Sequence, residues 1–187
     1  ATGAIDAGIK TAMTAMKGRE IWMIPILMSL FALGGTTYGM AEETLAFYAI
    51  LIPVMIAAGY DAVTGVATIL IGAGIGVLGS TINPFATVIA ANAAGIPFTE
   101  GMILRVVILL GGLVICAAYV MRYAHRVKTD PSRSIVAGQA DAHRRLFLHA
   151  GFGNMEDATL TGTQKVVPII FALTFALGVV SGITMSF

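Results

Sequence analysis

The sequence predicts an all-α polytopic membrane protein, and its composition, its low charge and the length of its apolar stretches indicate this class. Of the 187 residues, 57% are hydrophobic and 11% are charged, whereas soluble domains carry roughly 25% charged residues. This composition excludes both a water-soluble globule and a disordered chain. The net charge of +1 gives no basic field for nucleic acid. The single cysteine, Cys116, excludes an internal disulfide framework.

Five segments account for most of the predicted elements. An interfacial lead-in, residues 1–20, precedes four apolar stretches at residues 21–58, 62–96, 102–123 and 166–187. The last two stretches match the ~20 residues with which a helix spans the hydrocarbon core. The first two are too long for one straight helix, and each is interrupted near its middle. We also expect this sequence to be a portion of a longer chain.

The first interruption covers residues 34–43 and is polar. Gly34 and Gly35 are expected to end one half-helix, and Glu42 and Glu43 to open the next. The stretch therefore forms either two full spans or a re-entrant helical hairpin over residues 21–60. Its second half has about 15 residues, which is marginal for a span, so we favour the hairpin.

The second interruption covers residues 79–84. Gly79 is typical of a helix carboxyl end, Asn83 of a helix N-cap, and Pro84 of a first helical position. Irregular backbone at membrane depth is tolerated only inside protein or beside a water-filled cavity. Two such breaks in successive elements indicate a secondary-transporter site.

The basic residues fix which ends face the cytoplasm. They gather in the lead-in and in residues 122–165, and the loop at 97–101 has none. By the positive-inside rule, the first two are cytoplasmic and the loop is external. Residues 61–97 then cross once, as a discontinuous transmembrane helix. Residues 102–124 return, 125–165 form a cytoplasmic connector, and 166–187 cross again.

The two breaks supply the candidate binding residues. We expect substrate contacts from Gly35, Thr36, Thr37 and Glu43 in the first break and from Ser80, Thr81, Asn83 and Pro84 in the second. Carbonyl and side-chain oxygens at Gly79, Ser80 and Asn83 are candidate Na⁺ ligands. We expect no catalytic residue and no other cofactor.

Two charged residues have structural explanations. Asp61 is expected to cap the helix that follows it. Arg105 lies one turn inside its crossing, from which its side chain can extend outward. The glycine pattern at 74–79 has no preceding strand, so a nucleotide-binding loop is not expected there.

Five segments resemble one transporter family. These are GTTYGMAEE at 35–43, GAG at 72–74, GSTINPF at 79–85, YVMRYA at 119–124 and KTDPS at 128–132. They are similar to the YfcC family of the C4-dicarboxylate anaerobic carrier (DcuC-like) group, within the ion transporter superfamily. The resemblance covers nearly the whole chain and is weakest at 134–159.

The resemblance implies two inverted repeats, each with a re-entrant hairpin and a broken helix, in an elevator-type homodimer of the bacterial inner membrane. It places Gly35, Thr36, Thr37 and Glu43 at the hairpin tip, with Ser80, Thr81 and Asn83 in the broken helix. The dicarboxylate symporters of the superfamily read Ser-Asn-Thr at the tip, where this chain reads Gly-Thr-Thr. We therefore expect either an amino-acid-like substrate or a carboxylate.

The leading functional hypothesis is an ion-coupled secondary transporter, driven by Na⁺ or H⁺, for a small carboxylate or amino-acid-like metabolite. A membrane-embedded enzyme is the first alternative, but the sequence shows no nucleophile–base pair or metal motif at membrane depth. A non-transporting helical subunit is the second. Binding of a substrate or ion would stabilise a transporter against unfolding and would not stabilise such a subunit.

Overall fold

The computed structural model describes residues 18–149, with side chains to residue 147. Every regular element within this range is a helix, as the predicted all-α class requires. The lead-in at 1–17, the second part of the connector at 150–165 and the expected crossing at 166–187 lie outside the described residues.

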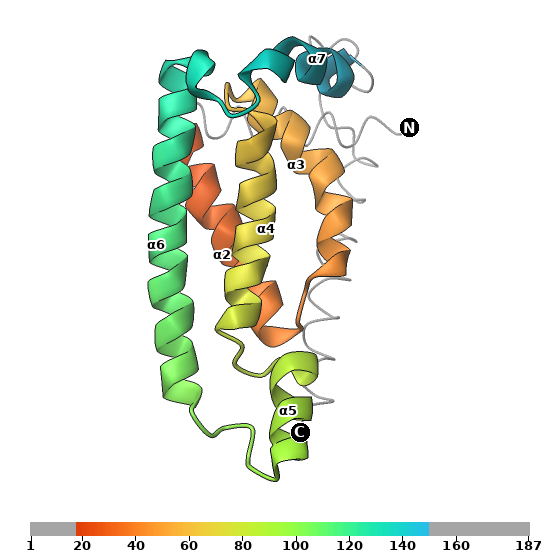
Figure 1. Ribbon diagram of the computed structural model, residues 1–187, viewed down its shortest axis with the longest axis vertical. Coiled ribbons are helices and arrows are strands. Elements are labelled where there is room, and N and C mark those ends of the chain that lie inside the picture. Colours follow the sequence, from red (N-terminus) through yellow and green to blue (C-terminus); the bar gives the residue numbers. More distant parts are fainter. Residues whose placement is uncertain (1–17, 150–187) are drawn as a thin grey trace, which may run out of the picture.

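The first two long helices run antiparallel and are joined by a tight reversal (Figure 1). A short 3₁₀ turn, η1 (Glu20–Trp22), leads into α2 (Met23–Thr37), and a second, η2 (Glu42–Thr44), leads into α3 (Leu45–Ala57). The chain reverses at Gly39, whose φ of +83° is a left-handed conformation that favours glycine. We call the two helices the α2–α3 pair, and this reversal the tip of the α2–α3 pair.

The third long helix, α4 (Ala62–Leu78), lies at the centre of the bundle and packs against α2, α3 and α6 (Figure 1). Helical structure stops at its end, and residues 79–83 have no regular form. It resumes as a π-turn, η3 (Pro84–Val88), continued by α5 (Ile89–Ala94).

The longest helix is α6 (Met102–Thr129). It runs past the expected end at 124, because Arg126 and Lys128 suit the negative end of the helix dipole. Short elements follow at the end of the molecule opposite α5 (Figure 1). They are η4 (Pro131–Arg133), η5 (Ala137–Gln139), α7 (Ala140–Arg144) and η6 (Arg145–His149).

The prediction that Gly34 and Gly35 end a half-helix was wrong. Both lie inside α2, which continues to Thr37. A Cβ on Gly35 would lie 2.5 Å from the carbonyl oxygen of Ala73 in α4. Gly35 therefore serves close packing of α2 on α4, while a Cβ on Gly34 would lie 3.1 Å from the side chain of Met40. A local reading of the sequence took both glycines for a helix stop.

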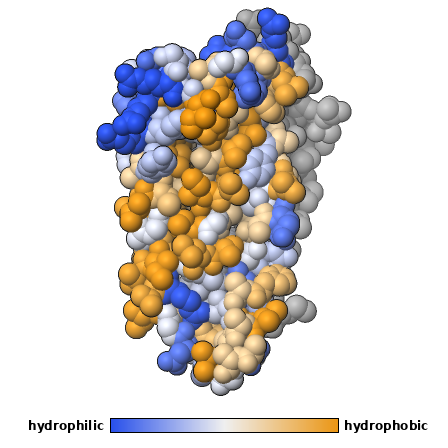
Figure 2. Space-filling view, viewed as in Figure 1, coloured by the Kyte–Doolittle hydropathy of each residue, from blue (hydrophilic) through white to orange (hydrophobic). Residues whose placement is uncertain are grey.

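The apolar surface is extensive. By length and composition, two helices among residues 18–149 are able to cross a membrane, Glu20–Thr37 and Met102–Thr129. Large apolar side chains of α6, including Ile103, Val114 and Ile115, are exposed. Figure 2 shows hydrophobic residues over the middle of this face and a concentration of hydrophilic residues at the end that carries α7.

Candidate functional site

The irregular segment after α4 meets the tip of the α2–α3 pair through one buried asparagine. Asn83 is 1% exposed. Its Oδ1 accepts hydrogen bonds from the amides of Phe85 (2.9 Å) and Ala86 (3.1 Å), which caps the helix that follows. Its Nδ2 donates to the carbonyl of Gly35 in α2, at 3.2 Å. One side chain therefore both restarts a helix and joins it to α2.

A second set of bonds connects the same two segments through Thr36, which is 3% exposed. The Thr36 hydroxyl donates to the carbonyl of Gly79 (2.9 Å) and accepts from the amide of Thr81 (3.0 Å). The Thr36 carbonyl accepts from the amide of Ile82 (3.3 Å) and the hydroxyl of Thr81 (3.2 Å). We call the contact between residues 35–39 and 79–83 the junction.

The two segments touch so closely that side chains are excluded at particular positions. A Cβ on Gly39 would lie 2.7 Å from Oδ1 of Asn83. The positive φ of Gly39 and this contact both require glycine there. The role of Gly39 beside Asn83 was not predicted, because sequence alone marks the turn and does not show what lies behind it.

Ser80 lies at the edge of the junction and faces a different partner. Its hydroxyl pairs with that of Thr87, at 2.5 Å, and both residues are buried. The Thr87 hydroxyl also donates to the Ser80 carbonyl, at 3.3 Å. Sequence reasoning missed Thr87. Its position one turn into the helix after Pro84, facing back toward the break, was the available signal.

Two expected site residues have other partners in this structure. The Thr37 hydroxyl donates to the carbonyl of Leu33 in its own helix, at 2.6 Å. The Glu43 carboxylate is exposed and accepts from the amide of Ala41, at 3.2 Å. Pro84 is half-buried and begins the helix that Asn83 caps.

Some oxygen atoms of the junction are better candidate ligands for a hard cation such as Na⁺ than others. Carbonyl and hydroxyl oxygens are appropriate ligands for such ions. The Gly79 carbonyl accepts one hydrogen bond and keeps a lone pair, whereas Oδ1 of Asn83 already accepts two. Gly79 therefore fits the expected Na⁺ site better than Asn83. Within residues 18–149, no cluster of His, Cys, Asp or Glu side chains is arranged to hold a metal.

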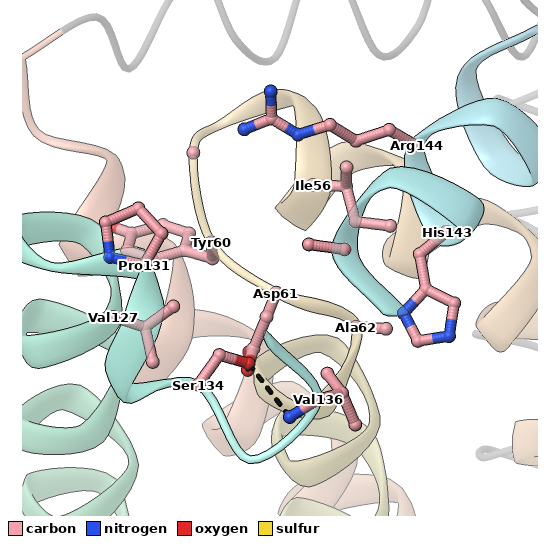
Figure 3. Close-up of a pocket in the computed structure, with 12 residues that line it drawn as sticks. Ile56, Tyr60, Asp61, Ala62, Val127, Pro131, Ser134, Val136, His143 and Arg144 are labelled. Carbon is pink, nitrogen blue, oxygen red and sulfur yellow. Dashed lines mark hydrogen bonds between the residues drawn. The ribbon is translucent and has the colours of Figure 1, made fainter. Parts of the chain in front are cut away.

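The opposite end of α4 is held by a carboxylate, as the sequence predicted for Asp61. Its Oδ1 accepts from the Thr64 amide (2.8 Å) and hydroxyl (2.6 Å), which caps α4. Its Oδ2 accepts from the hydroxyls of Tyr123 and Ser134, each at 2.6 Å. We call Asp61, Thr64, Tyr123 and Ser134 the base cluster. Figure 3 shows Asp61 and Ser134 meeting beside a small cavity, with the Val136 amide donating to Ser134.

The hydrogen bonds of the base cluster favour the ionised form of Asp61. Burial alone would raise the pKa of this carboxyl, but hydrogen bonds from Ser134, Thr64 and Tyr123 outweigh burial and lower the pKa. Asp61 is therefore ionised at neutral pH. Close by, Lys128 pairs with Glu20 at 3.3 Å and lies 4.9 Å from the ring centroid of Tyr60. Burial raises the pKa of Tyr60 to about 12.

The chain matches known proteins over its whole length. A family profile described as "C4-dicarboxylate anaerobic carrier" matches residues 1–187. An uncharacterized protein of Haemophilus influenzae is 38% identical over 94% of this chain and 34% of its own length. A protein of Escherichia coli K12 named "Putative basic amino acid antiporter YfcC" is 40% identical over 78% of this chain and 30% of its own length. The chain thus spans about a third of these relatives. No solved structure matches.

Proposed function

Because the chain belongs to the C4-dicarboxylate anaerobic carrier family, we propose that it forms one repeat of an ion-coupled secondary transporter for a small carboxylate or amino-acid-like metabolite. Family membership indicates a membrane carrier rather than an enzyme. The finer proposal is an elevator-type homodimer in a bacterial inner membrane, coupled to Na⁺ or H⁺. Since the matched relatives are about three times as long, the other part of the site belongs to the remainder of the protein.

The observation that carries the proposal is the junction. Residues far apart in sequence, Thr36 in α2 and Gly79 to Asn83 after α4, are joined by hydrogen bonds in a buried setting. Irregular backbone of this kind, facing the tip of a helix pair, is the arrangement in which transporters place solute and ion sites. We propose that α2 and α3 form a re-entrant hairpin and that α4 and α5 form one discontinuous crossing.

The residues of the junction have distinct proposed roles. Asn83 and Thr36 are positioning residues, because their polar atoms are engaged with protein groups. Thr81 is half-buried, and its hydroxyl, with the carbonyl of Gly79, contributes to the ion or substrate site. Ser80 contributes through its pair with Thr87. Thr37 and Glu43 join the site only after the hairpin tip rearranges, since each has a local partner here.

The test measures uptake by the full-length protein in proteoliposomes, with succinate and L-arginine as solutes and with Na⁺ or pH gradients. We expect Asn83→Ala to abolish uptake and leave membrane insertion intact, because it removes both the helix cap and the bond to Gly35. Asn83→Asp retains the cap oxygen and loses the donor, so it should impair uptake with less effect on thermal stability. Asn92→Ala, at an exposed position of α5, is the matched control. Wild-type uptake in Asn83→Ala would refute the proposal.

A further inference from the structure

We propose that a recess beside the junction binds a zwitterionic solute, with Arg105 recognising its carboxylate and Glu100 its ammonium group. The inference rests on the proposed transporter function and adds a second binding position to it. The recess has a volume of about 570 Å³ and lies between α5, the loop at 95–101 and the first turns of α6. Its lining includes Ser80, Thr87, Ala90, Ala94, Glu100 and Arg105.

Arg105 is held in place and keeps donor capacity. Its Nη2 donates to the backbone carbonyls of Phe98 and Glu100, the latter at 2.9 Å, which fixes the guanidinium against the loop. Its Nε is buried and has no hydrogen-bond partner in the described part of the chain. A buried donor without a partner is costly and calls for an explanation. A guanidinium, with its planar fork of donors, is suited to a carboxylate.

Glu100 brings the opposite charge to the same recess. Its side chain is exposed, and the ion pairs found within residues 18–149 are Lys128–Glu20 and Arg133–Asp130. Arg105 reaches the Glu100 backbone and does not pair with its carboxylate. A positive and a negative residue thus line one recess without forming an ion pair with each other. A zwitterion carries the complementary pair of charges.

The rest of the lining suits the uncharged part of such a solute. The wall of the recess that α5 and η3 supply consists largely of alanines, which leave open space beside the helix: Ala86, Ala90, Ala91 and Ala94. The Ser80–Thr87 hydroxyl pair also lines the recess, and Ser80 is adjacent in sequence to the junction residues Gly79 and Thr81. A solute bound by Arg105 and Glu100 would therefore lie next to the proposed site, on the side of the loop at 95–101.

The experiment compares binding of radiolabelled L-arginine and succinate to full-length protein in nanodiscs. Ala90→Leu adds bulk to the wall of the recess and changes no hydrogen-bond partner of Arg105. Ala93→Leu adds the same side chain to α5 at an exposed position outside the lining. We expect Ala90→Leu to weaken binding of both solutes about tenfold or more, and Ala93→Leu to leave it unchanged. Glu100→Gln should weaken L-arginine binding about tenfold, as loss of a charged hydrogen bond does, and leave succinate binding unchanged.

Three outcomes would overturn the inference. Equal affinities in Ala90→Leu and Ala93→Leu would show that the solute does not enter the recess. A lower Tm of Ala90→Leu than of Ala93→Leu without ligand would show that another segment of the protein fills it. Equal loss of both solutes in Glu100→Gln would contradict ammonium recognition. If only this inference fails, Asn83→Ala still loses binding; if the proposed function fails, wild type binds neither solute and both proposals fall.

Discussion

The two ends of α4 are attached to neighbouring segments in chemically different ways. At the junction, the bonds join hydroxyls, amides and carbonyls, and the side chains of Thr36 and Asn83 are buried. At the base cluster, a half-buried carboxylate collects hydroxyl donors from α4, from α6 and from the segment after α6. Uncharged groups therefore connect the carboxyl end of α4 to its neighbours, and an ionised carboxylate connects the amino end.

The difference follows from what each environment tolerates. A buried charge must be paired or hydrogen-bonded, and inside a membrane it is expensive. Neutral polar groups of the backbone satisfy each other at a much lower cost of desolvation. The junction therefore combines irregular backbone with uncharged polar groups. The proposed solute or ion site could then draw its ligands from these groups without a permanent ion pair in the protein.

The largest expected effect comes from separating the two helices at the junction. Gly35→Val places a side chain against the carbonyl of Ala73 in α4. Moving the two helices apart would strain the bonds that join α2 to Gly79 and Asn83. We expect a loss of about 3 kcal/mol in the free energy of unfolding, typical of severe overpacking. Thermal unfolding of the purified protein in detergent measures it.

The control for this prediction lies on α4, the helix against which Gly35 packs. Gly74 has open space where a Cβ would lie, so Gly74→Ala should be neutral or slightly stabilising, since alanine favours helix by about 1 kcal/mol over glycine. Equal Tm values for the two variants would show that the close approach of α2 and α4 contributes little.

The second prediction tests the contribution of one hydroxyl of the junction to stability. Thr36→Val keeps the shape of the side chain and removes the donor to Gly79 and an acceptor for Thr81. We expect a loss of about 2 kcal/mol, because buried polar groups are left without partners. Thr37→Val removes a hydroxyl that bonds only within its own helix and should cost less. If both variants unfold at the same temperature, the junction is not a stabilising contact.

The smallest effect concerns the base cluster. Asp61→Asn removes the charge while keeping one acceptor, and we expect a loss of about 1 kcal/mol at neutral pH, reduced by the partial exposure of the group. Because the folded-state pKa is lowered, the stabilisation is present above the unfolded pKa of about 3.9 and is lost as pH falls through the folded value. Denaturant unfolding at pH 7, 5 and 3 should show a constant difference from wild type between pH 7 and 5 and a smaller one at pH 3.

A comparable variant elsewhere sharpens this pH test. Asp130 also caps a short helix, and hydrogen bonds from Ser132 lower its pKa, but its side chain is 45% exposed and bonds only to residues within three positions. Asp130→Asn should therefore change stability less than Asp61→Asn. The reverse order would mean that the base cluster does not hold α4, α6 and the following segment together.

Local chemistry made some of these features readable in the sequence. Gly79 and Asn83-Pro84 are signals that act on the residues beside them, and helical structure stops and restarts next to them. The capping role of Asp61 was likewise a local property, and it is confirmed. The apolar composition predicted the helical class, because a helix satisfies its backbone hydrogen bonds internally when lipid surrounds it.

Contacts between distant segments were not readable. The role of Gly35 was misjudged, because the carbonyl that approaches it lies in α4, nearly forty positions away in the chain. The hydroxyls of Tyr123 and Ser134 reach Asp61 through tertiary structure alone. Placement in the membrane, the second repeat and the coupling ion stay predictions from the sequence.

The bonds of the junction end mostly on main-chain atoms, and this has a consequence for how related proteins diverge. Carbonyls of Gly35, Thr36 and Gly79 are present whatever side chains surround them. Substitution at neighbouring positions therefore leaves these acceptors in place, while the side chains of the proposed site are free to vary. Homologues with different cargoes would be expected to share this backbone geometry and to differ at a handful of lining residues.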